Sequence, residues 1–397
     1  MSRVMVAVKT TEGGRWILPQ IQALRRRGAE VVVLLPAGPG RLASAVADLA
    51  SSDPAVRLVR SPFDFCFRPR RGLVAELAGL RRLVAAAEVD TVLYHLYATA
   101  LAIRLSTWGL RTRRVHMVAG PLYLESPLIA AVERVLWRWD SHIVCGSRYI
   151  FDRYRRLGVP AQRMSVVPYG VDTDRFRPGD AEERAQARQR LGLPAHGLVA
   201  VMVSYVYAPK RLVLRGRALK GHAVLLEAWG AFRARHPEAT LLLVGSGFDE
   251  AGERHRQEIV RDLRARHGGE GVAWLDSVED VQEVYRSADV SISPSLSDNH
   301  GAVLEASAMG LPSIVTDAGA LPEAVPAGTG WIAGAGSATD LLHCLEACAG
   351  AAADGGLADR GARARRYVVA HFDQRASTEQ VVDQLCGPAP AGVASRG

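Results

Sequence analysis

The chain has 397 residues, 48% of them hydrophobic, which exceeds what one hydrophobic core usually organises and predicts two domains. Up to Arg175, Lys and Arg outnumber Asp and Glu by twelve, but without the interleaved aromatic residues of a nucleic-acid platform, so no nucleic-acid partner is expected. No apolar run approaches the roughly 20 residues that span a bilayer. The five cysteines fit neither a zinc site nor a disulfide scaffold, which favours a reducing cytoplasm.

In the first half, short aliphatic runs alternate with longer amphipathic stretches such as Ile17 to Arg27. This alternation is typical of βα units that feed a parallel sheet. The expected strands are Val4 to Val8, Val31 to Leu35, Thr91 to Tyr94, Val115 to Val118 and Ile143 to Cys145.

The loop after the first expected strand is a candidate binding loop. It runs from Thr10 to Arg15, contains Gly13 and Gly14, and precedes a helix, whose unpaired N–H groups can hold an anion or a sugar hydroxyl. The spacing is not that of a dinucleotide-binding loop, and a plain tight turn is the alternative.

A domain boundary is expected between Val166 and Asp172, where a proline and a glycine interrupt the pattern and a polar stretch follows. A second series of βα units comes after it. Its expected strands are Leu198 to Val203, Thr240 to Val244, Val272 to Leu275, Val290 to Ser293 and Ser313 to Val315. Two sheets of this kind bind ligands at the carboxyl ends of their strands.

The segment from Pro294 to Ala306 carries the strongest functional signal. A strand ends at Ser293, a polar loop with a glycine follows, and a helix that begins near Ala302 carries Glu305 in its first turns. Backbone amides at such a helix start can hold phosphate, and a carboxylate there can accept both hydroxyls of a ribose. The alternative is that Glu305 only complements the helix dipole.

These segments together resemble the family 4 retaining glycosyltransferases of GT-B fold, in order over nearly the whole chain. The resemblance implies an α/β protein of two Rossmann-like domains facing each other across a cleft. The implied parts are an acceptor-binding domain (1–170), a nucleotide-sugar-binding domain (171–370), a C-terminal helix crossing back to the first domain (371–387) and a disordered tail (388–397). The other segments that carry it are Tyr169 to Asp172 with Phe176, Leu243 to Gly247, Ala288 to Val290 and Asp317 to Gly319.

Functional roles follow from this resemblance residue by residue. Glu305 would bind the donor ribose, Lys220 would contact the phosphates as a catalytic residue, and Gly13 and Gly14 would lie near the diphosphate. His95 matches a position near the acceptor. The remaining donor contacts are Gly245, Val278, Gly301, Ala302, Val303 and Leu304, and the remaining acceptor contacts are Tyr123 and Trp16.

The sequence departs from the family pattern at three places. Ser297 stands where the family has its first glutamate, and Asp298 beside it is the predicted catalytic substitute. The usual arginine before the phosphate lysine is absent from a longer, basic stretch at 205–219, in which Lys210 and Arg215 are the predicted replacements, although an exposed loop is the alternative. Ala119 replaces a common histidine.

The resemblance implies transfer with retention, from a nucleoside diphosphate sugar with UDP as the expected base, and without metal or other cofactor. The acceptor stays open among a small molecule, a polysaccharide and a lipid-linked sugar. The basic first half is compatible with peripheral contact of a cytoplasmic protein with the inner face of a membrane. Two alternatives remain, namely a sugar-nucleotide epimerase and a catalytically weak sugar-nucleotide binding protein.

Overall fold

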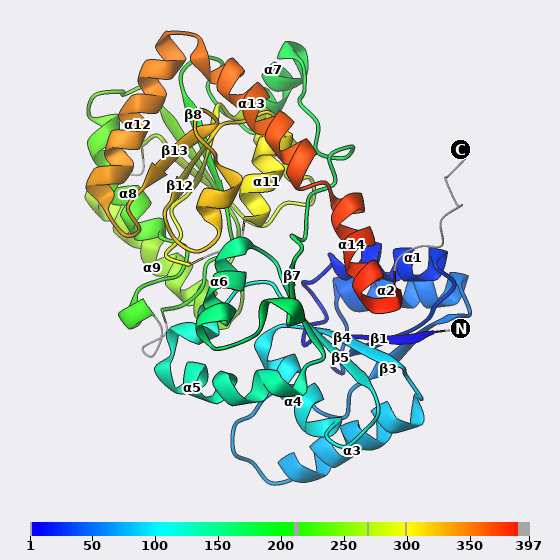
Figure 1. Ribbon diagram of the computed structural model, residues 1–397. Helices are drawn as coiled ribbons and strands as arrows, with labels where there is room; N and C mark the ends of the chain where they lie inside the picture. Colours follow the sequence, from blue (N-terminus) through cyan, green and yellow to red (C-terminus); the bar gives the residue numbers. More distant parts are fainter. Residues whose placement is uncertain (1, 210–213, 268–269, 298–299, 388–397) are drawn as a thin grey trace. The chain divides into compact units, whose positions relative to one another are not determined.

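The computed structural model describes residues 2–209, 214–267, 270–297 and 300–387. Within them the chain divides into two compact units. Unit 1 comprises residues up to Tyr169 together with the segment from Arg375 onward, and unit 2 comprises Gly170–Gln374 (Figure 1). Each unit is a parallel sheet covered by helices on both faces, as expected for a doubly wound α/β fold.

Unit 1 has a described sheet of seven parallel strands in the order β3-β2-β1-β4-β5-β6-β7. Its strands are β1 (Arg3–Ala7), β2 (Glu30–Leu35), β3 (Val56–Arg60), β4 (Thr91–His95), β5 (Arg113–Val118), β6 (His142–Cys145) and β7 (Met164–Val166). Its helices are α1 (Ile17–Arg26), α2 (Arg41–Ser52), α3 (Leu73–Ala86), α4 (Tyr97–Ser106), α5 (Pro127–Leu136), α6 (Arg148–Arg156) and α14 (Gln374–Cys386).

The two faces of the unit 1 sheet bury alternate residues of its strands. Val4 and Val6 of β1 pack with α1, α2 and α14, and Met5 and Ala7 pack with α3 and α4 (Figure 1). The α14 helix joins the first of these cores although it lies at the other end of the chain. Salt bridges from Arg27 on the end of α1 to α14 accompany this packing.

Unit 2 has a described sheet of six parallel strands in the order β10-β9-β8-β11-β12-β13. Its strands are β8 (Val199–Val203), β9 (Thr240–Val244), β10 (Val272–Leu275), β11 (Val290–Ser293), β12 (Ser313–Thr316) and β13 (Gly330–Ala333). Its helices are α7 (Ala181–Arg190), α8 (His222–Arg233), α9 (Glu250–His267), α10 (Val281–Ser287), α11 (Gly301–Ala308), α12 (Ala338–Ala353) and α13 (Gly356–His371).

Residues from α10, α11 and α13 form the core on one face of the unit 2 sheet, and residues from α8, α9 and α12 form the core on the other. In both units the strand order reverses beside the first strand of the unit, between β1 and β4 and between β8 and β11. Open α/β sheets bind ligands at such reversal points, beyond the carboxyl ends of the strands. Among the helices described, none is long and apolar enough to cross a membrane.

Candidate functional site

A cavity of about 270 Å³ lies at the carboxyl ends of β8, β9 and β10 in unit 2. It brings together four residues to which the sequence assigned donor or phosphate contacts: Lys220, Gly245, Val278 and Glu305. The other residues that line it are Val203, Ser204, Tyr205, Tyr207, Val244, Ser277 and Val281.

Glu305 projects from α11 and is half-buried in the wall of this cavity. The hydroxyl of Tyr285 on α10 donates a hydrogen bond to Glu305 Oε2 at 3.1 Å and also lies 3.2 Å from the carbonyl oxygen of Ala302. Burial raises the pKa of Glu305 to about 7, against the smaller opposing effects of the Tyr285 hydrogen bond and the charge of Arg175. The cavity therefore holds a carboxyl group that titrates near neutral pH and has one oxygen fixed.

The start of α11 supplies backbone N–H groups next to this carboxylate. The amide of Leu304 donates to the carbonyl of His300, the first hydrogen bond of the helix, and the Leu304 side chain is buried in the core. Leu304 is therefore a core residue whose amide is used inside the helix. The amides of Gly301, Ala302 and Val303 precede that first hydrogen bond, and such amides are the ones a helix leaves for an outside acceptor.

Lys220 is positioned by a close approach between two loops. Gly221, which precedes α8, has φ +73°, and a Cβ there would lie 2.0 Å from the carbonyl oxygen of Pro294. The amide of Leu296 donates to the carbonyl of Leu219 at 2.8 Å. The loop that carries Lys220 is thus tied to the segment that leads into α11, which explains why a lysine and a glutamate far apart in sequence line one cavity.

Gly245 ends β9 at a similarly tight point. Its φ is +139°, and a Cβ would lie 2.1 Å from the carbonyl oxygen of Ser204 at the end of β8. The indole N–H of Trp274 donates to the Gly245 carbonyl at 3.0 Å. Only glycine allows this approach, and the cavity floor between the two strands depends on it.

In unit 1, the loop after β1 and the end of β4 meet at the reversal point of the sheet. Gly13 is exposed with open space where a Cβ would be, and Gly14 is buried with φ +93°. His95 ends β4, and its ring lies 6.4 Å from that of Trp16. The predicted diphosphate loop and two predicted acceptor residues therefore belong to one end of unit 1.

His95 and Trp16 share a further feature. His95 Nδ1 lies 3.1 Å from the hydroxyl of Tyr169, and burial lowers the pKa of His95 to about 3, so its imidazole is neutral. In the described part of the chain, His95 Nε2 and Trp16 Nε1 are buried without hydrogen-bond partners. Buried polar atoms are usually satisfied, so these two are candidate ligand contacts.

The third predicted acceptor residue, Tyr123, lies in a different cluster. Its ring stacks on that of Tyr97 with centroids 4.2 Å apart, and its hydroxyl lies 2.5 Å from that of Tyr154. The structure therefore brings Trp16 and His95 together but gives Tyr123 other partners.

Comparison with known proteins assigns the chain to a family. Residues 13–175 match the model described as Glycosyltransferase Family 4, and residues 209–349 match the model described as Glycosyl transferases group 1. The chain belongs to the family 4 glycosyltransferases.

Two relatives of this family 4 glycosyltransferase are named D-inositol 3-phosphate glycosyltransferases. The one from Acidothermus cellulolyticus is 33% identical over 256 residues, 62% of this chain and 51% of its own. The one from Catenulispora acidiphila is 34% identical over 213 residues, 51% of this chain and 44% of its own. The chain thus spans about half the length of the curated relatives it matches.

Solved structures show that the fold is GT-B. HepE from Anabaena, solved with UDP-glucose, superposes with a TM-score of 0.78 at 19% identity, covering 97% of this chain and 99% of HepE. Sucrose-phosphate synthase from Thermosynechococcus elongatus gives a TM-score of 0.74 at 19% identity, covering 97% and 98%. At these identities the likeness concerns the fold.

Three predicted catalytic residues of this family 4 glycosyltransferase have side chains outside the described part of the structure. Lys210 and Asp298 lie outside the described residues. Arg215 lies in a short 3-10 helix (Leu214–Gly216), and its side chain is not among those described. Ser297, at the position of the family's first glutamate, is half-buried.

Sequence reasoning missed the residue that holds Glu305 from behind the cavity wall and two aromatic residues that line the cavity. Tyr285 fixes Glu305, but on α10 it carries no signal beyond that of a core tyrosine. The rings of Tyr205 and Tyr207 line the cavity and pack on Phe248, with centroids 5.7 and 4.9 Å from its ring. Their alternation around Val206 after β8 could have indicated an aromatic wall.

His116 on β5 is buried in a polar cluster of unit 1. The Arg104 guanidinium donates to both carboxylate oxygens of Glu133, at 2.7 and 2.8 Å, and to Asp140, and burial beside Arg104 lowers the pKa of His116. Among the described residues, His116, Glu133 and Asp140 form the one group close enough to hold a metal ion. Arg104 already forms ion pairs with both carboxylates, so the cluster is explained as a buried ion-pair network.

Proposed function

We propose that the chain transfers a sugar from a nucleoside diphosphate sugar, with UDP as the nucleoside diphosphate, to an acceptor, with retention of configuration and without a metal ion. The observation that carries this proposal is the cavity in which Lys220 and Glu305 meet at the carboxyl ends of the unit 2 strands. A cation for the phosphates and a carboxylate for the ribose are the two groups that a nucleotide end requires.

The reaction breaks the bond between the anomeric carbon and a diphosphate oxygen and forms a new bond from that carbon to an acceptor oxygen on the same face. Negative charge grows on the departing diphosphate, and Lys220 with the amides of Gly301 to Val303 stabilises it. The departing phosphate oxygen accepts the acceptor's proton, so no side chain has to act as base. Charge stabilisation by these groups is the reason for proposing that no metal takes part.

The chain has an Asp-x-Asp sequence, Asp172-Thr173-Asp174, a pattern that often holds metal in other glycosyltransferases. Here Asp172 Oδ1 accepts hydrogen bonds from the amides of Asp174 and Arg175 at 3.2 and 3.0 Å. This arrangement gives Asp172 a local role in the turn after the unit boundary and supports a metal-independent reaction.

On the acceptor side, the unpaired Trp16 Nε1 and His95 Nε2 support contact with acceptor hydroxyls. A small molecule, a polysaccharide and a lipid-linked sugar all offer such hydroxyls. The names of the relatives place D-inositol 3-phosphate first in the panel to be tested, and the arginine surplus of the first half fits a phosphorylated acceptor.

We also propose that unit 1 contacts an anionic membrane peripherally. On α5, Leu128, Val132 and Val135 are 74%, 42% and 58% exposed, and their spacing places them on one face of the helix. Arg134 and Arg138 lie beside them in sequence. An apolar face with flanking arginines is typical of helices that lie in a membrane interface. Binding to vesicles with and without phosphatidylserine, and its loss in Val135→Glu, tests this contact.

The donor is tested with a panel of UDP, GDP and ADP sugars, by thermal stabilisation and by turnover with mixed acceptors. We expect a UDP sugar to raise the melting temperature. Turnover should fall strongly in Lys220→Ala and Glu305→Ala and be retained in Cys344→Ala. Cys344 lies on α12 and does not line the cavity. Conversion of the donor without acceptor would identify an epimerase, and binding without turnover would identify a binding protein. Either result would refute the proposal.

A further inference from the structure

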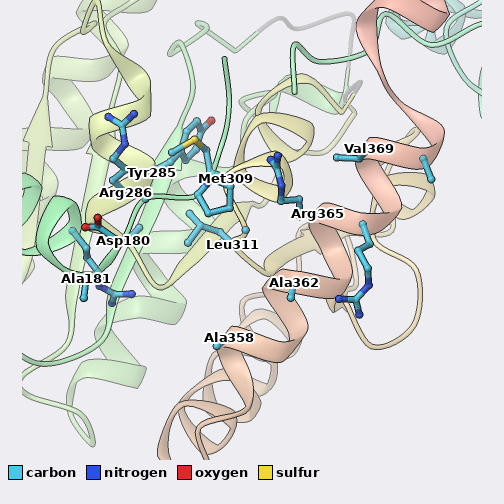
Figure 2. Close-up of a pocket in the computed structure, with 17 residues that line it drawn as sticks. Asp180, Ala181, Tyr285, Arg286, Met309, Leu311, Ala358, Ala362, Arg365 and Val369 are labelled. Carbon is cyan, nitrogen blue, oxygen red and sulfur yellow. The ribbon is translucent and has the colours of Figure 1, made fainter. Parts of the chain in front are cut away.

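A second and larger hollow lies on unit 2, apart from the donor cavity. It has a volume of about 1030 Å³ and runs between α13 on one side and the segment from Pro178 through α7, with α10 and the end of α11, on the other. Figure 2 shows Arg365 on α13, Met309 and Leu311 after α11, and Arg286 on α10 around this groove. None of its lining residues was assigned a role from the sequence.

The groove is strongly basic. Four arginines line it, Arg184, Arg286, Arg365 and Arg366, against the single carboxylate of Asp180. Of these four, Arg184 alone is paired with a carboxylate among the described residues, that of Asp289. In the described part of the chain the other three form no ion pair.

None of the hydrogen bonds that Arg286 and Arg365 make to described residues has a carboxylate as its acceptor. Arg365 donates to the carbonyl oxygens of Phe176, at 2.9 Å, and Ala308. Arg286 contacts Gln282 at 3.3 Å, and its Nε is buried without a partner among the described residues. Arg366 is exposed. A buried guanidinium N–H without a partner and several positive charges without counter-charges favour an anionic ligand.

The rest of the lining is apolar. Met309, Leu311 and Val369 contribute aliphatic surface, and Pro178 and the alanines of α13 complete it. A volume of this size is at the upper end of the range for small-molecule sites. Guanidinium groups around an apolar floor match a ligand that combines a phosphate with a ring or aliphatic body.

We propose that this groove, which we call the arginine groove, binds a phosphorylated small molecule with an apolar or ring-shaped body and that its occupancy alters donor binding. The inference has two halves: the ligand binds in the groove (the binding half), and its binding alters donor binding (the coupling half). The coupling half rests on the proposed function, because it assumes that Glu305 contacts the donor. The binding half does not.

Two structural elements connect the arginine groove to the donor cavity. Tyr285, which is fully buried, lies in the wall of the groove, and its hydroxyl donates to Glu305 Oε2 in the cavity. The helix α11 carries Glu305 toward the cavity, while Met309, which follows its last turn, lines the groove. A ligand that shifts Tyr285 or the end of α11 therefore changes the position of the carboxylate that meets the ribose. Such coupling is reciprocal for binding affinities.

Phenyl phosphate is the probe for the binding half, because it joins a phosphate to an apolar ring, and phenol is its neutral control. Calorimetry on the full chain should show saturable binding of phenyl phosphate and none of phenol. The affinity for phenyl phosphate should fall at least tenfold in the double variant Arg286→Ala/Arg366→Ala and in the single variant Arg366→Glu. Arg366 is exposed, so we expect its substitution to leave folding intact. The affinity should be unchanged in Arg360→Ala, which removes an arginine of the same helix that does not line the groove.

Three results would each overturn the site. They are no saturable binding of phenyl phosphate, an affinity for phenyl phosphate that the groove substitutions leave unchanged, and one-for-one displacement of phenyl phosphate by UDP. Binding is also measured with two further probes, inorganic phosphate and vesicles that contain phosphatidic acid. Binding of the vesicles in place of phenyl phosphate would assign the phosphate to a lipid and overturn the small-molecule site.

The coupling half is tested by UDP titrations with and without saturating phenyl phosphate. We expect the UDP affinity to change by about fivefold or more, and the change to disappear in Tyr285→Phe while phenyl phosphate still binds. Unchanged UDP affinity would refute the coupling and leave the site intact. If UDP itself does not bind but phenyl phosphate does, the proposed function fails and the arginine groove stands.

Discussion

Glu305→Gln should make the protein without donor more stable at alkaline pH. The folded protein holds the Glu305 proton up to a pKa of about 7, whereas the ordinary value in the unfolded chain is 4.5. Between these values the folded state binds more protons than the unfolded state, so the free energy of unfolding falls as the pH rises through this window. A shift of this size corresponds to about 3 kcal/mol above pH 7. The amide avoids this loss, because it is neutral and still accepts a hydrogen bond from Tyr285.

The same substitution should weaken donor binding. A carboxylate accepts two ribose hydroxyls, whereas an amide offers one acceptor oxygen, and hydrogen bonds to a charged group contribute about 1.5–3 kcal/mol. UDP affinity should therefore fall roughly 10- to 100-fold at pH 8. In the wild type, UDP affinity should rise with pH up to about 7, because the proposed contact with the ribose uses the ionised form of Glu305. In Glu305→Gln this dependence should disappear.

Scanning calorimetry at pH 5 and pH 9, without and with UDP, measures both effects. For a unit of this size we expect a melting temperature about 6–12 °C above wild type at pH 9 without UDP, and a much smaller difference at pH 5. Glu258→Gln is the matched control, because its side chain is 58% exposed on α9. A Glu305→Gln protein less stable than wild type at pH 9, or equally dependent on pH, would refute a buried carboxyl group in the cavity.

Two further predictions follow from contacts in the two units, and two from the proposed chemistry. Lys220→Ala should lower kcat/KM by about 10²- to 10³-fold with little change in melting temperature, measured by steady-state kinetics. Gly221→Ala should destabilise unit 2, because its Cβ would lie 2.0 Å from the Pro294 carbonyl oxygen, and a rise in melting temperature would contradict this. Arg104→Met should cost about 3–5 kcal/mol in unit 1 by leaving Glu133 buried without its counter-charge, as denaturant titration would show. Turnover should be unchanged by EDTA, and stimulation by Mg²⁺ or Mn²⁺ would contradict the metal-independent reaction.

Most strands were predictable because their sequences are buried on both faces. All ten expected runs are strands, with ends within two residues of the prediction. The sequence reading missed β3, β7 and β13. In β3, Arg57 and Arg60 interrupt the apolar run at a sheet edge, and β7 has only three residues. These strands form because a neighbouring strand offers unpaired backbone groups. This is a tertiary effect, and it cannot be predicted from a short stretch of sequence.

The candidate site was predictable where one local sequence sets one local geometry. A polar loop that leads into a helix with Glu305 is such a case, and the glycine after Lys220 is another. Tyr285 was not predictable, since its role depends on how α10 packs against α11. For a similar reason the sequence did not show that the Leu304 amide donates to the His300 carbonyl in the first turn of α11.

Among the described residues, Tyr285 is the one side chain that donates a hydrogen bond to the half-buried carboxyl group of Glu305. Further donors to Glu305 would lower its pKa and stabilise the ionised form before any ligand arrives. With one donor, the second oxygen stays open to the cavity and the group stays partly protonated near neutral pH. The ribose hydroxyls would then supply the missing hydrogen bonds, so that ionisation of Glu305 and binding of the nucleotide favour each other. A site arranged in this way releases a proton when it binds donor below pH 7, and calorimetry in buffers of different ionisation enthalpy would detect that proton.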